Sequence, residues 1–212
     1  MVLMGVVQIS TYCELKTIKT NNNCGGKMKR AFLIGKNVYL RPLEREDLKG
    51  PYSEWINDLE VTRYMEAGAF PVTNDDLETY FEQNLSSRNS VIFAIIVKKS
   101  EKHIGNARIY NISWVHRTAV RGIMIGDKSA WNEGYGLEVI NLLSEYAFKR
   151  LNLNKLNSGT SADNIGINKV NERAGYKQEG ILREEYYIEG RYCDFIRWGL
   201  LKSDYLSLKE FN

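Results

Sequence analysis

The sequence predicts an α/β or α+β domain with a mixed sheet. Three runs rich in β-branched and apolar residues follow one another in the middle of the chain, and short polar segments separate them. Further strands are predicted after a central helix, so that strands lie on both sides of it. With 212 residues and 43% hydrophobic content, the chain is long enough to bury one substantial core.

The first part of the chain is set apart by its composition. A polar segment at 20–26, with consecutive asparagines and glycines, separates the N-terminus from the regular patterning. We therefore expect residues 1–27 to form an appendage that is either not native or poorly ordered, with translation starting at Met28. Residues 28–212 are expected to form a single domain.

The first half of this domain is predicted to contain one strand and two helices. The strand covers 38–43, and the helical stretch at 44–57 places its large apolar residues on one side. A second helix begins at Thr73 or Asn74, where the threonine or the asparagine caps it, and the aspartates in its first turn suit the helix dipole. Residues 65–72, between the helices, are predicted to form a loop.

The middle of the domain is predicted to form a meander of strands at 91–97, 104–112 and 119–125. The polar turns between these strands are short, which implies antiparallel pairing. The remaining elements follow in order: a helix at 134–150, a strand at 155–161, a helix at 165–174, and strands at 176–188 and 192–201 joined by a tight turn at Glu189-Gly190.

Composition argues against several classes of partner. The net charge is +3 and acidic residues are interleaved with basic ones, so we expect no nucleic-acid binding. Cys13, Cys24 and Cys193 show no metal-ligand spacing, so no metal site is expected, and their low number fits a reducing cytoplasm. No apolar run reaches the length of a membrane span, so no membrane association is expected.

The most informative segment leads from a strand ending at Ile125 into the helix at 134–150. Gly134 and Gly136 lie in the first turn of that helix, where backbone N–H groups lack partners and the helix dipole favours a phosphate. Glycines there allow the backbone to approach a pyrophosphate closely. Taken alone, this pattern more often reflects close packing of a helix against a strand.

Several further segments occur in an order that is more specific than any one of them. They are Leu40-Arg41-Pro42-Leu43 with the residues up to 48, Trp55-Ile56-Asn57-Asp58, His103-Ile104-Gly105-Asn106, 163–176, 179–183 and 189–194. Together with the glycine segment, this series resembles the GNAT superfamily of N-acetyltransferases, in its ribosomal-protein-alanine and spermidine acetyltransferase branch. The resemblance covers residues 37–205.

The resemblance implies a mixed, mostly antiparallel central sheet that is flanked by helices and has splayed central strands. It also implies acetyl-CoA as the co-substrate, with its pantetheine arm between those strands. Relatives are commonly dimers, so a homodimer is expected. The expected cofactor contacts are the backbone of Ile123, Met124 and Ile125, the pyrophosphate segment Trp131, Asn132, Glu133, Gly134, Tyr135 and Gly136, and the later residues Asn164, Asn168 and Asn171.

Some of these positions depart from the pattern common in the family. Trp131 stands where many relatives have Gln or Arg, so it either contacts the cofactor or packs in the loop while backbone donors hold the pyrophosphate. Asn168 stands where others often have serine, and Asn171 where many have tyrosine. Asparagine cannot act as a general acid, so Asn171 is a catalytic candidate through hydrogen bonding alone, and the acid is unassigned.

Acetyl transfer requires a neutral amine to attack the thioester carbonyl. Glu66, in the predicted loop, is the catalytic candidate for binding or deprotonating that amine, and the alternative is an exposed loop carboxylate. The leading function is acetyl transfer from acetyl-CoA to a primary amine of a small molecule or to a protein N-terminus. The alternatives are a catalytically weak acyl-CoA-binding or sensor protein, and a domain in which the glycines only permit packing.

Overall fold

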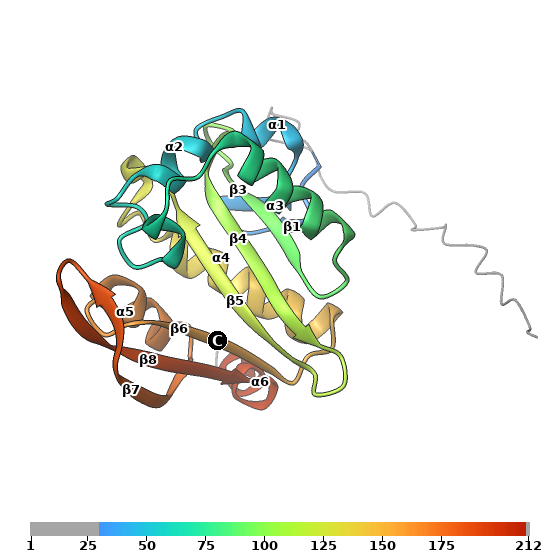
Figure 1. The fold of residues 1–212 in the computed structure, drawn as a ribbon. Helices are drawn as coiled ribbons and strands as arrows, with labels where there is room; N and C mark the ends of the chain where they lie inside the picture. Colours follow the sequence, from blue (N-terminus) through green and yellow to red (C-terminus); the bar gives the residue numbers. More distant parts are fainter. Residues whose placement is uncertain (1–29, 211–212) are drawn as a thin grey trace, which may run out of the picture.

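A computed structural model describes residues 30–210 and contains one eight-stranded sheet with the order β1-β2-β3-β4-β5-β6-β8-β7 (Figure 1). All neighbouring strands are antiparallel except β5 and β6, which are parallel. The expected appendage at 1–27 lies outside the described residues. The strands are β1 (Leu33–Ile34), β2 (Val38–Pro42), β3 (Val91–Val97), β4 (Lys102–Ser113), β5 (Thr118–Ile125), β6 (Lys155–Ser161), β7 (Lys177–Ile188) and β8 (Arg191–Leu201).

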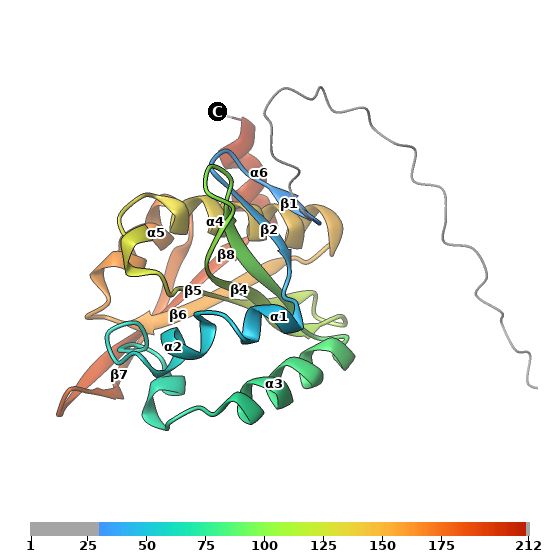
Figure 2. The same cartoon turned by 90° about the horizontal axis from the view of Figure 1, so that it is seen from above.

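Helices cover both faces of this sheet (Figure 2). The first three α-helices lie on one face, and α4 and α5 lie on the other. The helices are α1 (Arg45–Leu48), α2 (Tyr52–Asn57), α3 (Asn74–Ser86), α4 (Tyr135–Glu145), α5 (Ile165–Arg173) and α6 (Lys202–Glu210), with the short 3-10 helices η1 (Glu66–Ala69) and η2 (Lys128–Ala130) and the π-helix η3 (Tyr146–Arg150). The mixed, mostly antiparallel sheet confirms the expected fold class.

The sheet separates two hydrophobic cores, and strand β3 contributes to both. Phe93 and Ile95 are buried in the core beneath α4, whereas Ala94 and Ile96 are buried in the core beneath α2 and α3. Side chains alternate between the faces of a strand, so a strand covered on both faces needs apolar residues at every position. This explains the unbroken apolar run in β3.

The predicted helix at 44–57 is wrong in one respect, because the structure contains two helices there. Pro51 is the N-cap of α2, and Gly50 lies between the two helices. A proline inside a helix removes a hydrogen bond and clashes with the preceding turn, so the chain starts a new helix at this point. The predicted loop at 65–72 contains η1, and the predicted helix at 134–150 continues from α4 into the π-helix η3.

Two predicted local features are confirmed. Thr73 caps α3 in a capping box, in which the Asp76 N–H donates to Thr73 Oγ1 at 3.2 Å and the Thr73 N–H donates to Asp76 Oδ2 at 2.9 Å. The hairpin turn between β7 and β8 places Glu189 at φ 49° and Gly190 at φ 85°. Both angles are left-handed, as a two-residue hairpin turn requires.

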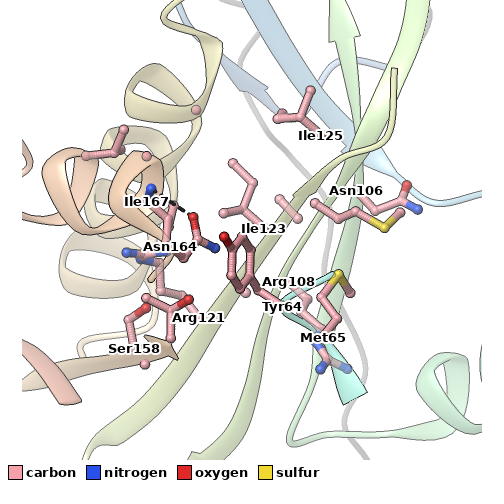
Figure 3. A pocket seen from close by; sticks show the side chains of 18 of the residues that line it. Tyr64, Met65, Asn106, Arg108, Arg121, Ile123, Ile125, Ser158, Asn164 and Ile167 are labelled. Atoms are coloured by element: carbon pink, nitrogen blue, oxygen red, sulfur yellow. Dashed lines mark hydrogen bonds between the residues drawn. The ribbon is translucent and has the colours of Figure 1, made fainter. Parts of the chain in front are cut away.

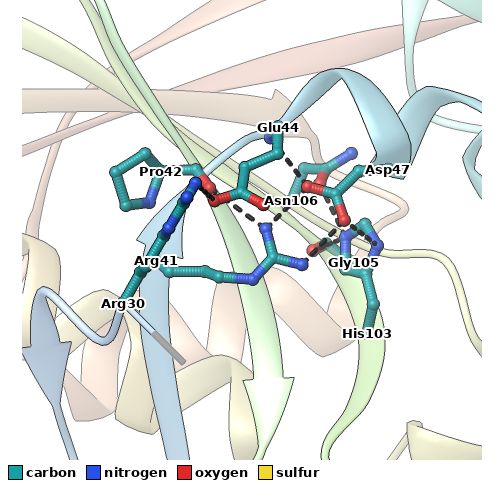
Figure 4. Close-up of polar contacts among 8 residues, drawn as sticks. All are labelled: Arg30, Arg41, Pro42, Glu44, Asp47, His103, Gly105 and Asn106. Atoms are coloured by element: carbon teal, nitrogen blue, oxygen red, sulfur yellow. Dashed lines mark hydrogen bonds and ion pairs between the residues drawn. The ribbon is translucent and has the colours of Figure 1, made fainter. Parts of the chain in front are cut away.

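A polar cluster joins the end of β2 to α1 and the start of β4 (Figure 4). Arg41 donates to both carboxylate oxygens of Asp47 at 2.7 Å, and the Glu44 N–H donates to Asp47 at 2.8 Å. His103 Nδ1 lies 3.7 Å from Asp47, and His103 Nε2 lies 3.0 Å from Asn106 Oδ1. Burial opposes ionisation of Asp47, but the hydrogen bonds from Arg41 and Glu44 outweigh it and lower its pKa. Burial lowers the pKa of His103, and the nearby Asp47 charge offsets only part of this effect.

This cluster predicts that the protein loses stability in acid. Folded His103 has a lowered pKa, so the unfolded chain takes up more protons as the pH falls through about 6.5, and stability declines there. Asp47 adds a second decline below about pH 4, where the unfolded carboxyl is protonated first. Urea unfolding between pH 7.5 and 5 should show the first decline, and it should be smaller in His103→Gln. An equal decline in both proteins would contradict this account.

Glu138 on α4 is predicted to hold that helix against the turn before β2. Its carboxylate accepts hydrogen bonds from the Asn37 N–H at 2.7 Å, from Asn37 Nδ2 at 3.0 Å and from the Val38 N–H at 3.2 Å. Glu138→Ala should lower the free energy of unfolding by about 1–3 kcal/mol, because backbone donors lose their acceptor. Glu138→Gln keeps an acceptor oxygen and should lose less. Denaturant titration measures both, and equal losses would exclude the hydrogen bonds as the cause.

Candidate active site

Strands β5 and β6 separate after a short contact and open a cleft through the sheet. They pair only at 118–120 and 155–157, although both strands continue beyond these residues. The cleft is lined by residues of both strands, of α3, α4 and α5, and of the segment between α2 and η1. The expected splayed central strands are therefore present, and the edge of β5 beyond the contact faces the cleft.

The backbone of β5 presents alternate residues to this cleft. The Gly126 N–H donates to Ile104 O at 2.9 Å, across the ladder to β4. Successive residues of a strand direct their N–H and C=O groups to opposite sides, so Ile123 and Ile125 direct theirs away from β4 and into the cleft. The backbone of Met124 faces β4, and its side chain packs beneath α2 and also lines the cleft, so the backbone contact expected of Met124 stays a prediction.

The N-terminus of α4 opens onto the same cleft. Gly134 is the N-cap at φ 81°, and no side chain caps the helix. A Cβ built on Gly134 or Gly136 would meet no heavy atom within 4 Å, and both residues line the cleft. These glycines therefore do not serve close helix packing. They leave the backbone donors of the first turn open to an anionic group, which fits the pyrophosphate of CoA.

The other residues of this segment divide between the cleft and its rim. Asn132 and Tyr135 line the cleft. Trp131 also lines it, and its indole N–H donates to Ile125 O at 2.7 Å, so it has a packing role in addition to any cofactor contact. Glu133 is exposed and is absent from the cleft lining, and its expected contact with the cofactor stays a prediction.

Only one of the expected asparagines of α5 faces the cleft (Figure 3). Asn164 caps α5 by accepting from the Ile167 N–H at 3.3 Å, and it lines the cleft. Asn168 is buried, donates to Ser161 O at 3.0 Å and accepts from Trp198 Nε1 at 3.0 Å. Its amide hydrogen bonds hold α5 against β6 and β8, and the expected cofactor contact of Asn168 stays a prediction.

Asn171 is also a core residue, not a cleft residue. It is 0% exposed, its Oδ1 accepts from the Arg121 guanidinium, and it does not line the cleft. This geometry gives no support to the catalytic and cofactor-binding roles expected of Asn171, which stay predictions. The helix turns this position inward, onto β5.

Sequence patterns alone did not identify Arg121, which lies where β5 leaves β6. It is 3% exposed yet lines the cleft. Its guanidinium carbon lies 4.7 Å from the centre of the Tyr176 ring, and its Nε has no hydrogen-bond partner within residues 30–210. A buried cation usually has a carboxylate partner. One signal was available: Arg121 interrupts an otherwise apolar strand.

The opposite side of the cleft carries polar residues that sequence reasoning also missed, except for Glu66 (Figure 3). The Tyr64 hydroxyl donates to Asp163 O at 3.3 Å, which links the segment before η1 to the start of α5. Glu66 is exposed and lines the cleft. Tyr186 of β7 also lines the cleft, and burial and then the charge of Glu66 raise its pKa.

Among the described residues, no group of three or more His, Cys, Asp and Glu side chains could hold a metal ion. No helix within 30–210 is both long and apolar enough to cross a membrane.

Comparisons with known proteins identify the family. The acetyltransferase (GNAT) domain matches residues 37–177. Spermidine N(1)-acetyltransferase of Vibrio cholerae is 31% identical, in a match that covers 84% of this chain and 100% of the relative. The enzyme of the same name from Escherichia coli K12 is 28% identical, over 81% of this chain and 89% of the relative.

A solved structure agrees with these sequence matches. Spermidine N-acetyltransferase from Vibrio cholerae, in complex with CoA and spermine, aligns with a TM-score of 0.75 at 28% identity, over 80% of this chain and 98% of that one. The expected fold, family and enzyme class are confirmed. The chain belongs to the GNAT family and is an acetyl-CoA-dependent N-acetyltransferase.

Proposed function

We propose that the protein transfers the acetyl group of acetyl-CoA to a primary amine of a small molecule or to a protein N-terminus, by direct attack of the amine on the thioester. The observation that carries this proposal is the arrangement of β5 and α4. The strand has an unpaired edge in the cleft, and the helix that follows it opens onto the cleft without a cap.

The cofactor side of the cleft is proposed to use backbone and basic groups. The N–H and C=O groups of Ile123 and Ile125 suit an amide-bearing pantetheine arm, because such an arm can extend the ladder. The first turn of α4 suits the pyrophosphate. Lys169 and Arg173 line the cleft from one side of α5, four residues apart, and neither has an ion-pair partner within the described chain. Their charges complement the phosphates of CoA.

The amine is proposed to enter on the other side, where Glu66 lies. The relatives named as spermidine N(1)-acetyltransferases support a small-molecule amine, although polyamines, amino sugars and protein N-termini all bear the required group. Glu66 accepts the amine proton, directly or through water, as the new N–C bond forms and the C–S bond breaks.

Arg121 is proposed to stabilise the departing thiolate in place of the tyrosine common in the family. Its buried cation precedes Ile123 on β5 and faces the cleft, and its Nε is open to a further hydrogen bond. A fixed cation in a dry site stabilises developing negative charge strongly. The thiolate then takes its proton from water.

A catalytically weak acyl-CoA-binding or sensor protein is the second candidate. It is favoured by Asn171, because this residue leaves no acid at the family position and does not reach the cleft. A thiol-release screen with acetyl-CoA against polyamines, amino sugars, aminoglycosides and N-terminal peptides separates the two. Calorimetric binding of acetyl-CoA without turnover of any acceptor would favour the sensor.

Gly136→Leu is predicted to weaken acetyl-CoA binding without unfolding the protein. The new side chain would extend into open space in the cleft, and a helical leucine is intrinsically more stable than glycine by under about 1 kcal/mol. Calorimetry should show at least about a tenfold weaker affinity, with an unchanged melting temperature. Gly180→Leu is the matched control, because Gly180 also has open space around it but does not line the cleft. Equal affinity of both variants would sink the cofactor assignment.

Arg121→Met is predicted to lower kcat by about 100-fold, the effect typical of removing one group that stabilises transition-state charge. The affinity for acetyl-CoA should change little, because backbone groups and α4 hold the cofactor. Arg121→Lys keeps a cation and should recover part of the rate. Single-turnover kinetics and calorimetry measure the two quantities, and thermal unfolding checks the fold. A folded methionine variant with normal kcat would contradict the role of Arg121.

A further inference from the structure

Arg108 lies on the opposite face of the sheet from Arg121, beside the point where β5 leaves β6. It is on β4 and pairs in register with Gly122 of β5. Gly122 has no side chain, and a Cβ there would lie 3.3 Å from Arg108 Nε and 3.6 Å from the Tyr110 ring. Arg108 therefore packs over Gly122, the β5 residue between Arg121 and Ile123. It lies on the face of the sheet from which the amine is proposed to enter.

Two tyrosines hold the Arg108 guanidinium in place. Its carbon lies 4.0 Å from the centre of the Tyr110 ring, and its Nη1 donates to the Tyr80 hydroxyl at 3.2 Å. A guanidinium carries five N–H donors, and the bond to Tyr80 is the only side-chain hydrogen bond of Arg108 within residues 30–210. A stacked cation with open donors is pre-organised for an anion.

The acidic residues of the cleft do not neutralise Arg108. No carboxylate within the described chain lies in salt-bridge distance of it, whereas Glu60 pairs with Lys128 and Glu179 pairs with Lys155, both at 2.6 Å. Asp76 is engaged in the capping box of α3. The cleft lining also includes Arg197, which has no ion-pair partner among the described residues. Glu66 also lines the cleft and has no ion-pair partner within the described chain, so one unpaired carboxylate stands against two unpaired arginines, and the amine side of the cleft is not an anionic groove.

We infer that Arg108 binds an anionic group on the acceptor, so that the acceptor is an amine that also bears a carboxylate or a phosphate. This inference rests on the proposed acetyl transfer and narrows its substrate class. A bidentate guanidinium pairs well with either anion. A polycationic acceptor would lie next to the positive charge of Arg108, which no carboxylate of the described chain neutralises. This repulsion beside the reacting centre is unfavourable. The same cation lowers the pKa of a nearby ammonium and so favours the neutral amine that attacks.

Matched acceptor pairs test this inference. Thiol release from acetyl-CoA is compared for alanine against alaninamide, for phosphoethanolamine against ethanolamine, and for spermidine. The carboxylate or the phosphate member should exceed its neutral partner by about tenfold or more in kcat/KM, as a charged hydrogen bond predicts. Arg108→Gln should bring that ratio close to one, and Arg108→Lys should keep part of it. Arg183→Gln, at an exposed arginine of β7 outside the cleft, should leave the ratio unchanged.

Two outcomes would overturn the inference: spermidine or the neutral members are preferred, or the anionic preference persists in a folded Arg108→Gln variant. Calorimetry of the same pairs on the CoA-saturated protein separates this inference from acetyl transfer itself. Absence of thiol release from every acceptor would count against acetyl transfer alone. Tighter binding of the anionic member that disappears in Arg108→Gln would then still support the role of Arg108, and equal binding would refute it.

Discussion

The short contact between β5 and β6 is the constraint on which the rest of the site depends. Buried backbone N–H and C=O groups require hydrogen-bond partners, and these two strands supply them to each other over only three residues each. Beyond that contact the indole of Trp131 satisfies one carbonyl of β5, at Ile125. The other groups on this edge face the cleft, in a sheet whose two faces are covered by helices. The molecule thus keeps an open strand edge in its interior, which suits an amide-bearing ligand.

Side chains alternate along β5, so consecutive residues of this strand contribute to opposite faces of the sheet. Arg121 points toward α5, where Asn171 and Tyr176 surround it. Gly122, the next residue, makes room on the other face for Arg108. Arg121 and Arg108 therefore lie on opposite faces of β5, at the point where the strand stops pairing with β6. Neither cation has a carboxylate partner in the described chain. In the proposed reaction, Arg121 on one face stabilises the leaving thiolate, and Arg108 on the other face binds the incoming acceptor.

Much of the fold could be predicted from local patterns, because capping residues, turn residues and strand alternation act over a few positions. The exceptions have physical causes. The apolar residues before and after Pro51 fit a single helical period, so the pattern did not reveal that the helix ends and a new one begins there. Strand β1 has only two residues, which are too few to show a period. In the site, a motif gives the residue type at each position but not the direction in which the side chain points. The inward orientation of the Asn168 and Asn171 side chains was therefore not predicted. Arg121 and Arg108 find their partners 50 and 28 residues away, beyond the range of local patterns.

The contact of Glu138 with the turn at 37–38 connects the proposed cofactor site to the start of β2. The same helix offers its first-turn backbone donors to the cleft and its fourth residue to that turn. Thermodynamic coupling between two sites is reciprocal, so we expect a ligand that steadies the helix also to slow hydrogen exchange at the amides of 37 and 38. On this expectation, hydrogen exchange at residues 37 and 38, which do not line the cleft, reports ligand binding, and substitutions at this turn change the affinity for the ligand.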